Sequence, residues 1–208
     1  MGTTLTHLLV LLMAYLVGSL PFGFLIGKFH GIDIRRHGSG NIGATNVRRV
    51  VGKDWGIVCF LLDFAKGLVP VLVVSHLFGN GTSSALSALT AAVVVLGHVF
   101  PVYLAFKGGK GVATTLGALL GIAPLAVVVG GLCWLAVFEL SRYVSLASIC
   151  AAGIMPVMAT VQYAALNGSI SGVSVAILYV LGGLIILRHG ENIKRLRLGT
   201  ENRFNRKK

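Results

Sequence analysis

The stretch that decides the fold is "VATTLGALLGIAPLAVVVGGLCWLAVFEL", residues 112–140, because its length fits neither one membrane-spanning helix nor two full ones. Its 29 residues exceed the roughly 20 apolar residues that one span requires. Divided near Gly121–Pro124, it would form two helices of about 20 Å each, at about 1.5 Å rise per residue. Whether this stretch forms one long helix or two short ones depends on how the other spans are oriented.

The composition of the whole chain is also strongly apolar. The 208 residues are 55% hydrophobic and only 12% charged, with a mean hydropathy of +0.86. Soluble domains carry about a quarter charged residues, so the composition indicates a membrane protein. Five more stretches reach roughly the length of a span: residues 5–25, 55–77, 84–106, 143–166 and 171–187. We predict one all-α integral membrane domain over residues 1–208.

Charge indicates which ends of these spans face the cytoplasm. The net charge is +12, and the 18 basic residues fall in five places. These are residues 28–53, Lys66, Lys107 with Lys110, Arg142, and residues 188–208. The short loops at 75–84 and 167–171 contain none. The positive-inside rule therefore predicts that the basic segments are cytoplasmic and that these two loops are outside.

This assignment decides how residues 112–140 run. With the N-terminus outside, the spans alternate correctly only if this stretch begins and ends inside. We therefore predict a hairpin of two short helices, broken near Gly121–Pro124 and thinner than the ~30 Å hydrocarbon core. The predicted total is about seven transmembrane helices. The alternative is six crossings, with the basic tail outside.

The most polar segment of the chain is "GSGNIGATNVRRV", residues 38–50. Gly38 and Gly40 permit left-handed turns, in which successive N–H groups can converge on an anion. Neutral and cationic donors accompany them: Ser39, Asn41, Thr45, Asn46, Arg48 and Arg49. Gly38, Gly40 and Gly43 match the pattern G-x-G-x-x-G, but they do not indicate a dinucleotide-binding site, because no strand precedes them. The alternative is a solvated loop whose arginines serve only topology.

A second polar insertion, "FKGGKG", directly precedes the stretch at 112–140. Lys107 and Lys110 lie among three glycines, which predicts a tight turn whose two ammonium groups reach a shared point. The helix expected to begin at Val112 would add N-terminal amides that favour an anion. The alternative is a pair of ordinary lysine anchors at a membrane surface.

Two later segments add candidates at helical spacing. In "SRYVSLAS", Ser145 and Ser148 lie three residues apart, and in "RHGENIKR", His189 and Asn192 do the same. The alternative for the serines is that they satisfy their own backbone or a neighbouring helix, and the alternative for the histidine is a structural role at the membrane boundary. The four polar segments together present many anion donors and few acids, which predicts a phosphate-bearing ligand. Nucleic acid is a poor fit, because no soluble domain with stacking aromatics accompanies the charge.

Ionisable residues also occur within a predicted span. Asp63 and Lys66 are three residues apart inside residues 55–77, and a mutual ion pair would make their burial tolerable. The three cysteines lie in apolar runs without paired spacing, so we expect neither disulfides nor a metal site.

The polar segments, taken in order, closely resemble the bacterial acyl-phosphate-dependent glycerol-3-phosphate acyltransferases. The resemblance is carried by "GSGNIGATNVRR", "GHVFPVYLAFKGGKGVATTLG", "RYVSLAS" and "RHGENIKRL", and it covers nearly the whole chain. It implies an inner-membrane enzyme that moves a fatty acyl group from acyl phosphate to the sn-1 hydroxyl of glycerol 3-phosphate. The implied products are lysophosphatidic acid and inorganic phosphate, in the first committed step of phospholipid synthesis. Neither a cofactor nor acyl-CoA is implied.

The resemblance and the residue chemistry together predict a site. The predicted catalytic residues are Ser39, Arg49, Lys110 and His189. The predicted substrate-binding residues are Gly38, Gly40, Asn41, Thr45, Asn46, Lys107, Ser145, Ser148 and Asn192. Arg48 departs from the family pattern and is assigned to topology or lipid headgroups. The expected partners are the two substrates and membrane lipids, and the resemblance leaves room for association with the enzyme that produces acyl phosphate.

Acyl phosphate is an activated anhydride, so its leaving group needs charge stabilisation more than protonation. We expect Lys110 and Arg49 to hold the phosphate charge, with Ser39 assisting. The proton of the glycerol hydroxyl would pass to a substrate phosphate positioned by His189, or to His189 itself. An organic-phosphate transporter is the rival function, but its polar residues would lie near the bilayer midplane rather than on one face.

Overall fold

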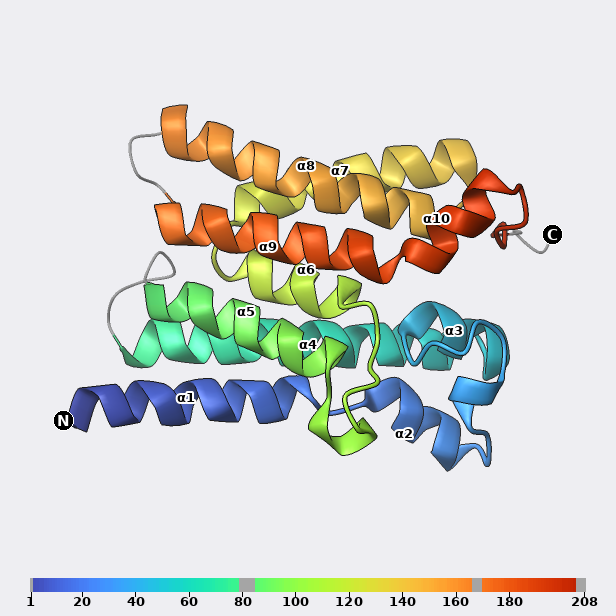
Figure 1. The fold of residues 1–208 in the computed structure, drawn as a ribbon, viewed down its shortest axis with the longest axis horizontal. Coiled ribbons are helices and arrows are strands. Elements are labelled where there is room, and N and C mark those ends of the chain that lie inside the picture. The colour runs from blue at the N-terminus through green and yellow to red at the C-terminus, as the bar shows by residue number, and fades with distance from the viewer. Residues whose placement is uncertain (1, 79–84, 166–169, 205–208) are drawn as a thin grey trace. The chain divides into compact units, whose positions relative to one another are not determined.

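The computed structural model describes residues 2–78, 85–165 and 170–204, and every regular element in these ranges is a helix (Figure 1). The elements, in chain order, are α1 (Gly2–Gly18), α2 (Phe22–Phe29), η1 (Ile34–Arg36), α3 (Ala44–Val50), α4 (Lys53–Leu77), α5 (Ala85–Val99), η2 (Val102–Leu104), α6 (Val112–Leu120), α7 (Pro124–Ser141), α8 (Val144–Ala165), α9 (Gly172–Arg188) and α10 (Gly190–Arg197). The η elements are short 3-10 helices.

The predicted class, an all-α membrane protein, is confirmed. Within the described ranges, five stretches are long and apolar enough to cross a membrane: residues 3–29, 53–77, 85–104, 124–141 and 144–165. The pair α9 and α10, bent by 55°, is a sixth candidate. The count of about seven helices is not confirmed. Of the loops predicted to lie outside, residues 79–84 and 167–169 fall outside the described residues, as does the end of the tail at 205–208.

The break in residues 112–140 is confirmed, but the predicted lengths of its arms were wrong. Helix α6 ends at Leu120 after nine residues, and α7 runs for 18 residues from Pro124. At about 1.5 Å per residue these are about 14 and 27 Å rather than two arms of about 20 Å. Proline is well accommodated in the first turn of a helix, where its missing N–H costs nothing. Pro124 therefore starts the longer arm instead of dividing the stretch evenly.

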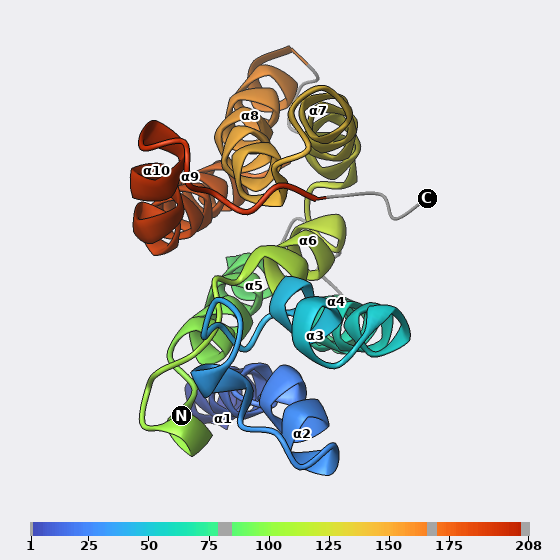
Figure 2. The same cartoon turned by 90° about the vertical axis from the view of Figure 1, so that its right-hand side faces the viewer.

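The chain forms two compact units, residues 1–122 and 123–208. The single functional domain expected from the sequence stays a prediction. In the first unit, α4 and α6 lie side by side (Figure 2), and two glycines are at their contact. A Cβ atom on Gly67 would lie 2.1 Å from the backbone oxygen of Thr114, and one on Gly117 equally close to that of Phe64. Small residues permit such approach in membrane helices, and this packing places α6 and the turn before it.

The second unit is a bundle of α7, α8 and α9, with α10 at one end (Figure 1). Gly130 of α7 packs against the side chain of Met155, and Gly182 of α9 packs against the backbone of α8. Arg142, with a left-handed φ of 63°, reverses the chain between α7 and α8. The bend after α9 carries the predicted residues His189 and Asn192.

Candidate active site

Asn46 organises the glycine-rich loop of the first unit. It is only 2% exposed, and its Nδ2 lies 3.2, 3.1 and 2.8 Å from the carbonyl oxygens of Ile34, His37 and Asn41. Its Oδ1 accepts from the backbone N–H of Ser39 at 2.9 Å. Both ends of the carboxamide are therefore engaged within the protein, and Asn46 shapes the loop.

The left-handed turns predicted for this loop are confirmed. Gly38 and Gly40 have φ values of +59° and +70°, and a Cβ atom on Gly38 would lie 2.2 Å from the Oδ1 of Asn46. The Oδ1 of Asn41 accepts from the backbone N–H of Gly43 at 2.8 Å, which forms an Asx turn directly before α3. Gly38 thus serves both backbone conformation and close packing.

The loop leaves a small set of donors at the surface. Ser39 is exposed, and Thr45 and Arg49 are exposed four residues apart on α3, on the same helical face. Arg48 is half-buried, and its Cβ lies where a side chain on Gly56 of α4 would collide. Burial therefore separates Arg49, which can meet a ligand, from Arg48, which packs against α4.

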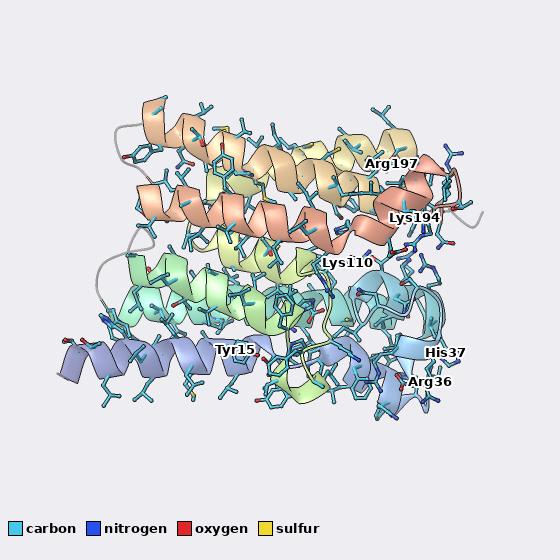
Figure 3. All side chains as sticks on the ribbon, in the orientation of Figure 1. Tyr15, Arg36, His37, Lys110, Lys194 and Arg197 are labelled. Carbon is cyan, nitrogen blue, oxygen red and sulfur yellow. The ribbon has the colours of Figure 1, made fainter. Side chains whose placement is uncertain are left out.

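The acid that lies nearest the start of the loop, Asp33, is paired with an arginine. Asp33 caps η1 by accepting from the backbone N–H of Arg35, and its carboxylate also pairs with that guanidinium at 2.8 Å. The hydrogen bond from Arg35 holds the pKa of the Asp33 carboxyl well below its usual range. Arg36 and His37 are exposed beside it, at the end of the unit where the loop lies (Figure 3). The acid is neutralised, so the loop region is positive.

The predicted turn at the second insertion is also present, but its amides have another use. The backbone N–H groups of Gly108 and Gly109 donate to the carbonyls of Val99 and His98, each at 3.2 Å. These carbonyls belong to the last turn of α5, where helical partners are missing. Gly111, with φ +86°, then starts α6. The turn thus folds back onto the end of α5, and its two glycine amides satisfy that helix rather than an anion.

The two lysines of this turn differ in exposure. Lys107 is exposed, whereas Lys110 is half-buried just ahead of α6 (Figure 3). A half-buried ammonium group acts in a less polar surrounding, where its field on an anion is stronger. That both ammonium groups reach a shared point stays a prediction.

A buried charged cluster lies next to this turn. The predicted ion pair is confirmed: Lys66 Nζ lies 2.7 Å from Asp63 Oδ1, and each side chain is 3% exposed. Lys66 also donates to the carbonyl of Leu20 at 2.6 Å, and His98 Nδ1 lies 3.5 Å from the same oxygen of Asp63. His98 was not predicted to join this pair, because it lies in a different predicted span from Asp63. Among the described residues, no group of three or more His, Cys, Asp or Glu side chains is placed to hold a metal ion.

In the second unit, Glu201 joins several polar residues. One of its carboxylate oxygens accepts from Ser145 Oγ at 2.9 Å and Asn192 Nδ2 at 2.7 Å. The other accepts from Arg195 Nε at 2.7 Å, and the Glu201 side chain is 7% exposed. Burial alone would raise the pKa of this carboxyl, but the bonds from Arg195, Asn192 and Ser145 outweigh it and hold the pKa below its ordinary value. Sequence reasoning missed Glu201, and its only signal was an acid in a strongly basic tail.

His189 lies at the junction of α9 and α10 and is 3% exposed. Its Nδ1 lies 2.8 Å from the carbonyl oxygen of Ile185. A carbonyl only accepts, so in the neutral ring Nδ1 carries the proton and Nε2 carries the lone pair. The helix thereby sets both the tautomer and the direction of the ring.

Ser148 follows the structural alternative that the sequence left open. Its hydroxyl donates to the carbonyl of Val144 in its own helix at 2.8 Å and accepts from Trp134 Nε1 at 3.2 Å. These bonds join α8 to α7. Ser145, three residues earlier, instead contacts the tail through Glu201.

The model of the family described as glycerol-3-phosphate acyltransferase matches residues 8–199 of this chain. The chain belongs to that family. A glycerol-3-phosphate acyltransferase of Aquifex aeolicus is 46% identical over 95% of this chain and 98% of its own length. One of Geobacter metallireducens is 50% identical over 96% and 98%, respectively.

Two solved structures are also similar. Both are crystal structures of PlsY (YgiH), an integral membrane glycerol 3-phosphate acyltransferase. The glycerol 3-phosphate form is 43% identical with a TM-score of 0.88, and the lysophosphatidic acid form is 42% identical with a TM-score of 0.84. Each comparison covers 96% of both chains. The family resemblance found in the motifs is thus confirmed, and this acyltransferase is a multi-pass membrane protein.

The hydrogen bonds of Asn46 predict that its replacement by aspartate destabilises the protein more than its replacement by alanine. Asn46→Asp places a carboxylate oxygen against three carbonyl oxygens. Asn46→Ala leaves those carbonyls without their donor and the Ser39 N–H without its acceptor, at about 1–3 kcal/mol for a buried group left unsatisfied. We expect Asn46→Asp to unfold at a lower temperature than Asn46→Ala in detergent at pH 8. The difference should narrow at pH 5, where the carboxyl regains a proton to donate. Equal stabilities at both pH values would contradict the assignment, and the exposed Thr45→Ala is the control.

Glu201 predicts a pH-dependent contribution to stability. Its pKa is lower in the folded protein than in the unfolded chain, whose value is near 4.5, so its contribution is present above that value and is lost as pH falls. Allowing for partial screening, we expect wild type to exceed Glu201→Gln by about 1 kcal/mol at pH 7, or about 2–4 °C in unfolding temperature. The gap should shrink below pH 4.5. A gap that is constant between pH 7 and pH 3.5 would show that the carboxylate charge is not involved.

Proposed function

We propose that this acyltransferase uses acyl phosphate as its donor, and that it acylates the sn-1 hydroxyl of glycerol 3-phosphate to give lysophosphatidic acid and inorganic phosphate. The observation that carries the proposal is the loop held by Asn46, which leaves Ser39, Thr45 and Arg49 exposed as donors for a phosphate. Support also comes from the relatives' structures, whose two forms contain the acceptor and the lysophospholipid product.

Arg49 and Lys110 are proposed to hold the phosphate charge. A guanidinium offers two parallel N–H groups to a pair of phosphate oxygens, and an ammonium group adds a compact positive charge. When the hydroxyl oxygen attacks the acyl carbon, the bond from that carbon to the bridging oxygen breaks. The phosphate then gains charge, and preorganised cations stabilise it as it develops. The exposed hydroxyl of Ser39 and the exposed backbone of Gly38 assist, whereas the N–H of Gly40 donates to the carbonyl of His37 at 3.0 Å and shapes the loop.

The hydroxyl proton is proposed to pass to a substrate phosphate, whose second pKa lies near 6 by analogy with phosphorylated side chains. The balance is then complete: acyl phosphate and the alcohol give the ester and hydrogen phosphate. His189, with its Nδ1–H donating to the carbonyl of Ile185, has a lone pair at Nε2 that can accept from the glycerol hydroxyl and orient it. Ser145 and Asn192 are held for substrate binding by their shared bonds to Glu201.

Three residues receive supporting roles. Asn46 shapes the glycine loop and Ser148 joins α8 to α7, because their polar groups have partners inside the protein. Lys107, exposed at the turn, is assigned to the membrane surface or the incoming substrate.

We propose the bacterial inner membrane as the location, with the basic face cytoplasmic and the N-terminus outside. Association with the enzyme that produces acyl phosphate belongs to the same proposal.

The test uses purified protein in lipid nanodiscs with palmitoyl phosphate and radiolabelled glycerol 3-phosphate. We expect one inorganic phosphate for each lysophosphatidic acid formed. Arg49→Ala and Lys110→Ala should each lower kcat/KM about 100- to 1,000-fold, the usual loss for removing a charge-stabilising group. Arg48→Ala is the matched control and should stay within about threefold, since Arg48 packs against α4. Equal losses in Arg48→Ala and Arg49→Ala would refute the phosphate role of Arg49.

The same assay on His189→Ala decides between the two bases. Reduced but measurable turnover supports the substrate phosphate as base. If turnover disappears while glycerol 3-phosphate affinity is unchanged, His189 itself removes the proton.

A further inference from the structure

We propose that Asp63 and His98 form a buried pair that positions the Gly108–Lys110 turn, and through it the ammonium group of Lys110. The inference rests on the proposed function, because it assigns Lys110 to phosphate. Asp63 and His98 touch no substrate in this account and act as positioning residues. All of these residues belong to the first unit.

The carboxylate of Asp63 is held in place by Lys66. Asp63 lies within the α4 span, and Lys66 lies 2.7 Å from its Oδ1. Lys66 donates in turn to the carbonyl of Leu20, in the segment between α1 and α2, at 2.6 Å. Cys59 Sγ approaches the other carboxylate oxygen at 3.7 Å. A charge buried so completely is costly, and it persists when partners hold it in a defined geometry.

His98, in the last turn of α5, lies between Asp63 of α4 and the glycine turn. Its side chain is 5% exposed, and its Nδ1 edge faces Asp63 Oδ1 at 3.5 Å. The opposite edge of the ring faces the turn: a Cβ atom on Gly109 would lie 2.1 Å from Nε2 and 3.1 Å from Cδ2. The backbone of Gly109 therefore lies directly against the imidazole, where no side chain fits.

The backbone of His98 holds the same glycine. Its carbonyl accepts from the N–H of Gly109, and the next carbonyl, of Val99, accepts from the N–H of Gly108. Both ends of His98 thus contact the residue that directly precedes Lys110. A shift of the ring toward Asp63, or away from it, would move the start of α6 and the position of Lys110.

An ion pair that merely joins α4, α5 and the segment after α1 would explain the burial of the charges. It would not require the imidazole to lie between the carboxylate and Gly109, nor Gly109 to lack a side chain. A structural role and a positioning role of the Asp63–His98 pair differ in whether the effect of changing the pair depends on Lys110. A structural role changes stability or all kinetic constants alike, whereas a positioning role disappears once Lys110 is absent.

The experiment is a double-mutant cycle in nanodiscs with palmitoyl phosphate and glycerol 3-phosphate. Replacing both charges, Asp63→Asn with Lys66→Met, avoids leaving one buried charge unpaired. This variant should lower kcat about 10-fold in the wild-type background, with KM for glycerol 3-phosphate within about threefold. In the Lys110→Ala background it should lower kcat less than twofold. Cys59→Ala, which removes the contact with the other carboxylate oxygen of Asp63, controls for lost packing and should leave kcat within about twofold.

A second variant keeps the test decisive if the double replacement fails to fold. His98→Asn retains a polar group toward Asp63 and removes the ring edge against Gly109, and it should show the same coupling to Lys110. A 10-fold loss in both backgrounds, or no loss in the wild-type background, would overturn the inference. Wild-type protein that transfers no acyl group would instead refute the proposed function, so the two failures are distinguishable.

Discussion

A polar group that enters the hydrocarbon of a membrane has to find its partner inside the protein, and the rest of this structure depends on that constraint. Asp63 satisfies it with Lys66 and His98, and Lys66 satisfies it further with the carbonyl of Leu20. The last carbonyls of α5 satisfy it with the amides of the glycine turn. The pairings of Asp63 with His98, of Lys66 with Leu20 and of α5 with the glycine turn join different segments of the chain, so the same bonds that make burial tolerable also place the polar residues.

The constraint separates two kinds of polar residue that look alike in the sequence. Asn46 and Thr45 are neighbours and both are neutral donors, yet Asn46 is buried with its carboxamide engaged by the loop, whereas Thr45 is exposed. Arg48 and Arg49 divide in the same way. The geometry thus reduces a broad set of anion donors to a few that can meet a ligand, held by others that cannot.

Much of this was predictable from local patterns. The apolar runs predicted the helical membrane class, the glycines at 38 and 40 predicted left-handed turns, and the spacing of Asp63 and Lys66 predicted their ion pair. Patterns of this kind depend on neighbours within a few residues, which the sequence displays directly.

Contacts between distant residues could not be read in this way. Glu201 meets Ser145 across 56 positions, and His98 meets Asp63 across two different helices. Nothing in the spacing links these pairs, because only the packing of the helices brings them together. The unequal lengths of α6 and α7 were missed for a related reason: the position of Pro124 at the first turn of a helix, rather than the total apolar length, decides where the longer arm begins.

A competition between two labelled donors shows whether this acyltransferase takes its acyl group from acyl phosphate. Wild-type protein in nanodiscs would receive equimolar ¹⁴C-palmitoyl phosphate and ³H-palmitoyl-CoA with unlabelled glycerol 3-phosphate, and both isotopes would be counted in the lysophosphatidic acid formed. The account predicts ¹⁴C in the product and ³H at background. Product that carries ³H at a comparable or higher level would contradict it.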